Sequence, residues 1–182
     1  MIDLSSTQAL AAKYVGDRLP AAPGRLSGKV AVVTGSAQGF GLGIAQELYK
    51  EGAFVVIADL NEPAARQVAA ELGGRALAVK VDVSDEASVA SLLVQTVSAF
   101  RGLDLFVSNA GVLKAGSLEE MEKKDFEFVT AVNYTAFFTC VKYASLVMKA
   151  QFAEDPAWSG DIITINSKSG LVGSNKNFAY AG

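Results

Sequence analysis

Two groups of residues in this sequence have types and spacings suited to holding a phosphate and to moving a proton. The first is the segment 34–41, Thr-Gly-Ser-Ala-Gln-Gly-Phe-Gly, which follows an apolar run and precedes a helical pattern. Glycines at such a turn let the backbone approach a pyrophosphate, and the next helix offers unpaired N–H groups and a positive dipole end. The second group is Ser167 with Tyr180 thirteen residues later. This pair can bind a carbonyl oxygen and exchange a proton with it.

An acidic residue complements the glycine turn. Asp59 ends a second apolar run, and no lysine or arginine stands in the turn or directly after Asp59. A carboxylate at that place accepts hydrogen bonds from ribose hydroxyls and repels a 2′-phosphate. The pattern therefore predicts NAD as the cofactor rather than NADP, with a plain glycine turn as the alternative interpretation.

Apolar runs that alternate with amphipathic segments must position these residues. The expected strands lie at 30–33, 54–58, 76–81, 103–107 and 161–165, and the expected helices at 42–51, 62–72, 85–100 and 124–148. Ser84 is the predicted N-cap of the third helix. This alternation is typical of βαβ units and predicts an α/β fold, a Rossmann-like doubly wound parallel sheet that is incomplete at its C-terminal side.

The N-terminal segment has a different composition from the rest. Residues 1–26 contain a possible short helix at 8–15 and then a stretch rich in proline and glycine, so we expect an arm or linker there. Residues 27–182 are expected to form the NAD-binding domain.

Composition excludes several classes of protein. A hydrophobic content of 51% argues against disorder, and a net charge of −3 argues against a nucleic-acid partner. The absence of histidine removes a Ser-His-Asp triad and a His-containing zinc site, so no metal is expected. Cys140 is expected to be a small core residue. The sequence shows neither a signal-peptide layout nor a membrane-spanning apolar run, which favours the cytoplasm.

The spacing Thr-Gly-x3-Gly-x-Gly, with Asn109-Ala110-Gly111, Asn133, Ser167 and Tyr180, resembles the short-chain dehydrogenase/reductase family. The match runs from about Lys29 to the last residue, although Ser108 stands where a second asparagine is common. Asp82 matches the family's acid that contacts adenine. The resemblance implies cofactor contacts at Gly35, Ser36, Gln38, Gly39, Phe40, Gly41, Asp59, Leu60, Asp82, Val83, Asn109, Ala110 and Gly111.

The resemblance also implies catalytic roles. Tyr180 would be the acid/base, Ser167 would bind the substrate oxygen, and Asn133 would hold a water in the proton path. The alternatives without a catalytic role are, in the same order, a partly buried tyrosine, a loop or capping serine, and an asparagine that forms a structural hydrogen bond to the neighbouring strand. The family places a lysine four residues after the tyrosine, which here lies beyond Gly182, so we expect the sequence as given to show no appreciable activity.

Two lysines suggest the substrate. Lys168 and Lys176 flank the segment of the serine, which is similar to the corresponding stretch of sorbitol-6-phosphate 2-dehydrogenases, and they either bind a phosphate or sugar hydroxyls or are solvated loop residues. Residues 1–26 look like the connection before the dehydrogenase half of bifunctional class II aldolase/dehydrogenase proteins. The expected function is an NAD-dependent interconversion of a secondary alcohol and a ketone on a sugar alcohol or sugar phosphate, in a parent homo-oligomer. Another polar ketone, or NAD binding without turnover, is the alternative.

Overall fold

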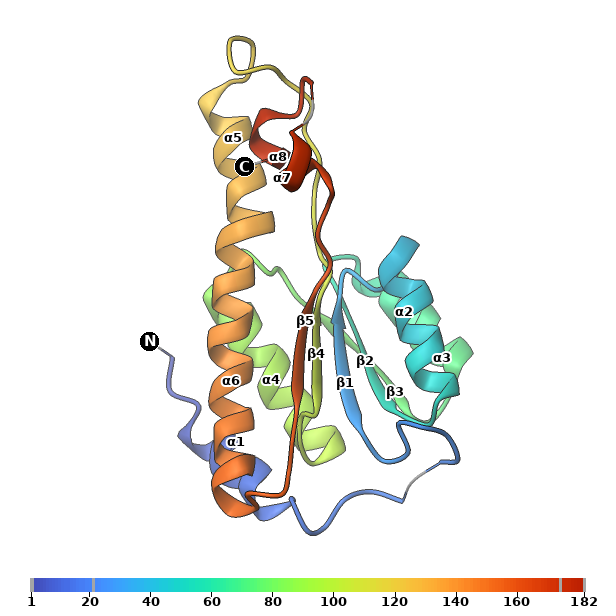
Figure 1. Ribbon diagram of the computed structural model, residues 1–182. Helices are drawn as coiled ribbons and strands as arrows, with labels where there is room; N and C mark the ends of the chain where they lie inside the picture. The colour runs from blue at the N-terminus through green and yellow to red at the C-terminus, as the bar shows by residue number, and fades with distance from the viewer. Residues whose placement is uncertain (1, 21, 174, 182) are drawn as a thin grey trace.

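The computed structural model describes residues 2–20, 22–173 and 175–181, and its centre is a five-stranded sheet (Figure 1). The strands are β1 (Val30–Thr34), β2 (Phe54–Asp59), β3 (Ala76–Lys80), β4 (Leu105–Ser108) and β5 (Asp161–Thr164). They lie in the order β3-β2-β1-β4-β5, and all pairs are parallel. From β1 the sheet extends through β2 to β3 on one side and through β4 to β5 on the other. The crevice at the carboxyl ends of β1 and β4 is where such sheets bind ligands.

Helices cover both faces of the sheet, as the predicted doubly wound fold requires. α2 and α3 lie on one face, and α4 and α6 lie on the other (Figure 1). The described helices are α1 (Ser5–Lys13), α2 (Gly39–Lys50), α3 (Glu62–Leu72), α4 (Glu86–Phe100), α5 (Lys123–Thr130), the π-helical turn η1 (Ala131–Thr135), α6 (Ala136–Glu154), α7 (Ser169–Val172) and α8 (Phe178–Ala181).

The near-continuous apolar sequence of β1 follows from this layering. Val32 packs into the cluster beneath α4 and α6, whereas Val33 packs into the cluster beneath α2 and α3. Successive side chains of a strand point to opposite faces, so a strand covered on both sides needs apolar residues at every position. All five residues of β1 are buried.

β5 forms an edge of the sheet within the described part of the chain. It pairs with β4, and most of its residues are exposed. Ile163 is 46% exposed and Ile165, just beyond the strand, is 41% exposed. Within the described part of the chain, β5 therefore has a strand partner on one side alone. Such an edge is a template for further strand pairing or aggregation.

The start of α4 and the course of the long helix after β4 differ from the sequence expectation. The N-cap of α4 is Asp85 and not Ser84, because the Asp85 carboxylate accepts the Ala87 and Ser88 N–H groups at 3.2 and 3.1 Å. The long helix expected at 124–148 is a succession of α5, η1 and α6. Serine and aspartate are both good N-caps, so composition alone did not separate two adjacent candidates.

The N-terminal segment lies against the helical layer. α1 begins earlier than the expected 8–15 and packs on α6 and α4 (Figure 1). Leu4 and Ala11 are buried there, 4% and 0% exposed, and the Gln8 amide donates to the Leu146 carbonyl at 3.1 Å. This part of the predicted arm is therefore integrated into the core cluster of the sheet.

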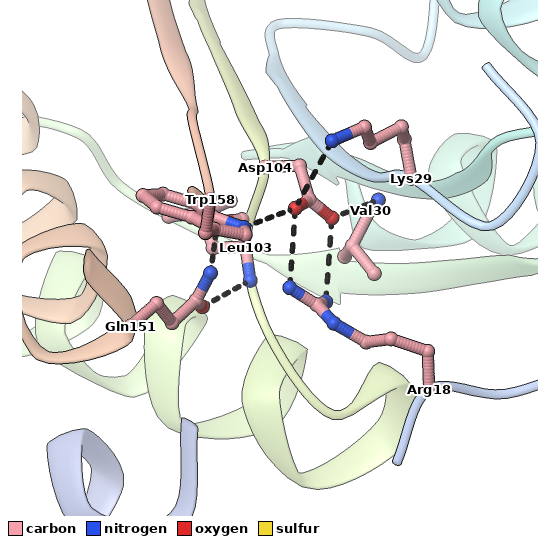
Figure 2. A network of polar contacts seen from close by, with 7 residues as sticks. All are labelled: Arg18, Lys29, Val30, Leu103, Asp104, Gln151 and Trp158. Carbon is pink, nitrogen blue, oxygen red and sulfur yellow. Dashed lines mark hydrogen bonds and ion pairs between the residues drawn. The ribbon is translucent and has the colours of Figure 1, made fainter. Parts of the chain in front are cut away.

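A buried carboxylate fastens the rest of the arm to the base of the sheet (Figure 2). Asp104, 5% exposed, accepts hydrogen bonds from Arg18, from the indole N–H of Trp158 at 2.8 Å and from the N–H of Val30 at 2.8 Å. Lys29 lies 3.9 Å from the same carboxylate. Donors from the arm, from β1 and from the segment before β5 thus converge on one residue that precedes β4.

Candidate active site

The glycine turn after β1 packs directly against the turn after β4. Gly35 has φ +64°, and a Cβ at this position would lie 2.9 Å from the Ala110 Cα. A Cβ on Gly41 would lie 2.2 Å from the Gly35 carbonyl oxygen. Neither position has room for a side chain, so these two glycines allow the close approach of the two turns.

Four hydrogen bonds hold the two turns together. The Asn109 side-chain amide donates to the carbonyls of Thr34 and Gly35 at 2.8 and 3.1 Å. The Thr34 hydroxyl oxygen in turn accepts the N–H groups of Asn109 and Ala110, each at 3.0 Å. Thr34 is thus a structural part of the site that the sequence expectation did not single out, although it opens the motif.

Asp59 stands at the end of β2, beside the glycine turn. Its two carboxylate oxygens accept the N–H groups of Ala37 and Asn61, both at 2.9 Å. These bonds fix the orientation of the carboxylate, and each oxygen keeps further acceptor capacity for a ligand hydroxyl. The position fits the predicted contact with a ribose.

These turns form one cavity of about 440 Å³ at the carboxyl edge of the sheet. Among the described residues that line it there is no lysine or arginine. The predicted cofactor residues that line it are Gly35, Gln38, Gly39, Phe40, Gly41, Asp59, Leu60, Asp82, Val83, Asn109, Ala110 and Gly111. Backbone N–H groups at the start of α2 can bind phosphate, and the Asp59 carboxylate can accept hydrogen bonds from a ribose. With the apolar walls, these features fit a dinucleotide.

Ser36 is the predicted cofactor residue that does not line this cavity. Its side chain is fully buried, and its hydroxyl donates to the Val33 carbonyl at 2.7 Å and accepts the Ala58 N–H at 3.1 Å. It stitches the turn to β1 and β2, and it is not among the residues that line the cavity. Both hydrogen bonds of this hydroxyl serve the fold, and the predicted cofactor contact at Ser36 stays a prediction.

A second cavity of about 880 Å³ adjoins the first. Ser167, Tyr180 and Asn133, the three predicted catalytic residues, all line it, as does Lys168. The two cavities share the wall residues Phe40, Asn109, Ala110, Gly111 and Val112. The predicted catalytic groups therefore open onto the same crevice as the predicted nucleotide site.

Ser167 and Tyr180 are held in place by different interactions. The Ser167 hydroxyl oxygen accepts the Ser169 N–H at 3.2 Å, so its O–H can donate into the cavity. Tyr180 lies on α8, which is fastened by backbone bonds between Gly116 and the segment 176–178 at 2.7 and 3.2 Å. The Phe178 ring also lies 6.1 Å from the Phe126 ring of α5.

Asn133 lies in η1, and its side chain is already engaged. Its amide oxygen accepts the Val112 N–H at 2.8 Å, and its amide nitrogen donates to the Val112 carbonyl at 2.9 Å. These bonds match the alternative of a structural hydrogen bond, with the turn after β4 as the partner in place of the strand, and the catalytic role of Asn133 stays a prediction. Single π-helical turns often occur at functional sites, and this one places the amide against the wall that both cavities share.

Two other residues singled out in the sequence are not among the described residues that line the cavity of Ser167. Lys176 has φ +58° and gives its carbonyl to the Gly116 N–H. Cys140 is buried, as predicted, and burial raises the pKa of its thiol to about 12, so it is inert at neutral pH.

Part of each cavity wall was not predicted from the sequence. Val81, Ser84, Val112, Phe128 and Val132 complete the first cavity. Leu113, Thr130, Tyr134, Thr164 and Asn166 are among those that complete the second. The positions around η1 carried no sequence signal, because an uninterrupted helical pattern does not show which side faces a crevice.

Within the described ranges no helix is long and apolar enough to cross a membrane. Those ranges also contain no cluster of three or more histidine, cysteine, aspartate or glutamate side chains able to hold a metal ion.

The parallel sheet with a glycine turn at its switch point defines a Rossmann-type nucleotide-binding protein. A family model described as short chain dehydrogenase matches residues 29–182, and the chain belongs to this family.

Curated relatives of the chain are dehydrogenases and reductases. A 2,5-dichloro-2,5-cyclohexadiene-1,4-diol dehydrogenase of Sphingobium indicum is 39% identical over 161 residues, which are 86% of this chain and 61% of the relative. Secoisolariciresinol dehydrogenase of Forsythia intermedia is 37% identical, over 87% of this chain and 56% of the relative. The chain thus spans about three fifths of the length of these relatives.

Solved structures agree with the fold. The NADH complex of a 3-ketoacyl-(acyl-carrier-protein) reductase from Brucella melitensis matches with a TM-score of 0.81 and 32% identity, over 85% of this chain and 63% of the other. A short chain dehydrogenase/reductase from Burkholderia phymatum in complex with NAD matches with a TM-score of 0.79 and 30% identity, over 87% of this chain and 54% of the other. The neighbours support a nicotinamide cofactor.

Proposed function

We propose that this chain carries the cofactor site and the reacting side chains of an NAD-dependent oxidoreductase that interconverts a secondary alcohol and a ketone. The proposed substrate is a sugar alcohol or a sugar phosphate. One observation carries the proposal: Ser167 and Tyr180 line a cavity that shares a wall with the cavity of the glycine turn and Asp59.

The chemistry is divided between the cofactor and the chain. A bound nicotinamide would supply or accept the hydride. Tyr180 exchanges the proton with the substrate oxygen, and the Ser167 hydroxyl donates a hydrogen bond to that same oxygen. Asn133 holds the Val112 turn in place, so we assign its side chain to shaping the cavity rather than to carrying the proton.

The first prediction concerns the choice of cofactor. We expect NAD to bind at least about tenfold more tightly than NADP, about 1.4 kcal/mol, because the Asp59 carboxylate repels a 2′-phosphate and the described lining offers no cation to hold one. Calorimetric titration with both nucleotides measures this ratio. Equal affinities would contradict the argument from the carboxylate.

Asp59→Ala should bring the affinities for NAD and NADP closer together. The change also removes the bonds to Ala37 and Asn61, so both nucleotides should weaken, but the ratio of their affinities cancels that shared loss. Glu62→Ala is the matched control, since this acid pairs with Arg66 at the start of α3 and is not among the lining residues. It should leave the ratio unchanged.

The second prediction concerns the substrate. Lys168 is the lysine that lines the cavity of Ser167, and a charge-assisted bond to a phosphate would favour a phosphorylated polyol. Lys168→Ala should raise KM for such a substrate by about tenfold or more and leave KM for the unphosphorylated polyol nearly unchanged.

Lys176→Ala serves as the control for this experiment. It removes the same charge from the same segment, yet Lys176 is not among the lining residues, so both KM values should remain close to those of the wild type. Parallel increases for the two substrates in Lys168→Ala would mean that this lysine does not bind phosphate. Binding of the hydroxyls that the two substrates share would then be favoured.

A further inference from the structure

A tyrosine that lies outside both cavity walls joins three elements of the fold. Tyr143 of α6 is fully buried in the main core cluster. Its hydroxyl donates to the Glu86 carboxylate at 2.7 Å and accepts the N–H of Ile2 at 3.0 Å. Lys142 reaches the same Glu86 oxygen at 3.0 Å. The arm, α6 and the first residue of α4 therefore meet at one phenol group.

Glu86 lies directly after a loop that lines the predicted nucleotide cavity. The loop bonds to the first turn of α4, where the Ser88 hydroxyl accepts the Asp82 N–H at 2.9 Å. The Asp82 carboxylate accepts the N–H and the hydroxyl of Ser84 at 2.9 and 2.6 Å. Asp82 and Ser84 both line the cavity. A shift of the first turn of α4 would therefore move Asp82.

The end of α4 at the cavity is held by the Asp85 cap and by the buried Val89 and Ala90, and Tyr143 adds a hydrogen bond to its exposed first residue. Glu86 is about half exposed, and Asp82, Ser84 and Asp85 are also on the surface. The hydrogen bond from Tyr143, and after it the one from Lys142, lowers the pKa of Glu86, so the carboxylate is charged at neutral pH. A charged acceptor makes the bond from the buried phenol a strong one.

We propose that Tyr143 is a positioning residue for the adenosine half of the cofactor, because its hydroxyl fixes the first turn of α4 and, through Ser88, the Asp82 loop. The arm takes part, since its Ile2 N–H completes the bonding of the same hydroxyl. The inference rests on the proposed nucleotide cavity. It gives the N-terminal arm a role in cofactor affinity as well as in packing.

The test is the affinity of the full-length protein for AMP and for NADH, measured by calorimetry. Tyr143→Phe removes only the hydroxyl, and it should weaken the binding of both ligands by about three- to tenfold. Thr96→Val is the control, because in the described residues this buried hydroxyl of α4 donates to the Leu92 carbonyl of its own helix at 2.7 Å. It should lower the melting temperature comparably and leave both affinities unchanged.

A pair of changes at Glu86 keeps the test independent of core packing. Glu86→Ala should weaken AMP as Tyr143→Phe does, whereas Glu86→Gln keeps an acceptor oxygen for the phenol and should restore most of the affinity. Wild-type affinity in both Tyr143→Phe and Glu86→Ala would overturn the positioning role alone. Failure of the wild type to bind either ligand would overturn the proposed cofactor site as well.

Discussion

Replacing Tyr180 by phenylalanine in the full-length protein is expected to lower kcat by about 10²–10⁴-fold, the usual contribution of a positioned general acid or base. The change removes one oxygen from a side chain that lines the cavity beside Ser167 and leaves the ring in place. Steady-state kinetics of alcohol oxidation measures the loss. The affinity for NADH should stay close to that of the wild type, because Tyr180 is not among the residues that line the nucleotide cavity.

A second tyrosine in the same wall provides the control. Tyr134 of η1 also lines the cavity, but the residue is 73% exposed and the proposed chemistry gives it no proton to carry. Tyr134→Phe should retain most of kcat. If Tyr180→Phe kept its activity, or if the two variants lost activity equally, the acid/base would have to be another group.

The second large effect is on stability. Asp104→Ala should lower the free energy of unfolding by about 3–5 kcal/mol, the typical result of removing one partner from a buried ion pair. It leaves the Arg18 guanidinium, the Trp158 indole and the Val30 N–H without their common acceptor (Figure 2). Denaturant unfolding, followed by circular dichroism, measures the change.

An exposed ion pair of the same arm is the comparison. Asp17 contacts Arg101 at 3.0 Å, and its side chain is 68% exposed. Asp17→Ala should change the free energy of unfolding by no more than about 0.5 kcal/mol. A similar loss in both variants would show that the network around Asp104 adds nothing beyond ordinary surface charge.

The sequence predicted the sheet and the crevice well because both depend on local patterns. Short apolar runs alternating with amphipathic helices predicted the strands, and the glycine spacing after β1 predicted a turn that the structure packs against Ala110. Asp59 ends β2 and Asn109 follows β4. These strands pair on either side of β1, so the convergence of the two residues followed from the predicted topology.

The sequence did not predict contacts between distant residues. Nothing in the composition of the arm pairs Arg18 with Asp104 or Ile2 with Tyr143. Such partners are set by the tertiary packing of α1 on α6, and α1 itself has few buried residues to announce it.

Roles that depend on side-chain direction were also beyond the sequence. Ser36 lies inside the glycine motif, yet its hydroxyl turns inward to bond β1 and β2. The sequence gives no way to tell the roles of Lys168 and Lys176 apart. In the structure Lys168 lines the cavity, whereas the backbone carbonyl of Lys176 accepts the Gly116 N–H. Spacing fixes which turn a residue belongs to, whereas tertiary packing decides where its polar atoms point.

The most direct test of the proposed function follows the hydrogen itself. The full-length protein is incubated with NAD and a panel of polyols and polyol phosphates that carry deuterium on the reacting carbinol carbon, and the reduced cofactor is analysed by mass spectrometry. We expect deuterium-labelled NADH from at least one member of the panel, and none from the Tyr180→Phe variant over the same time. Unlabelled NADH, or no reduction with any member of the panel, would contradict the proposed function.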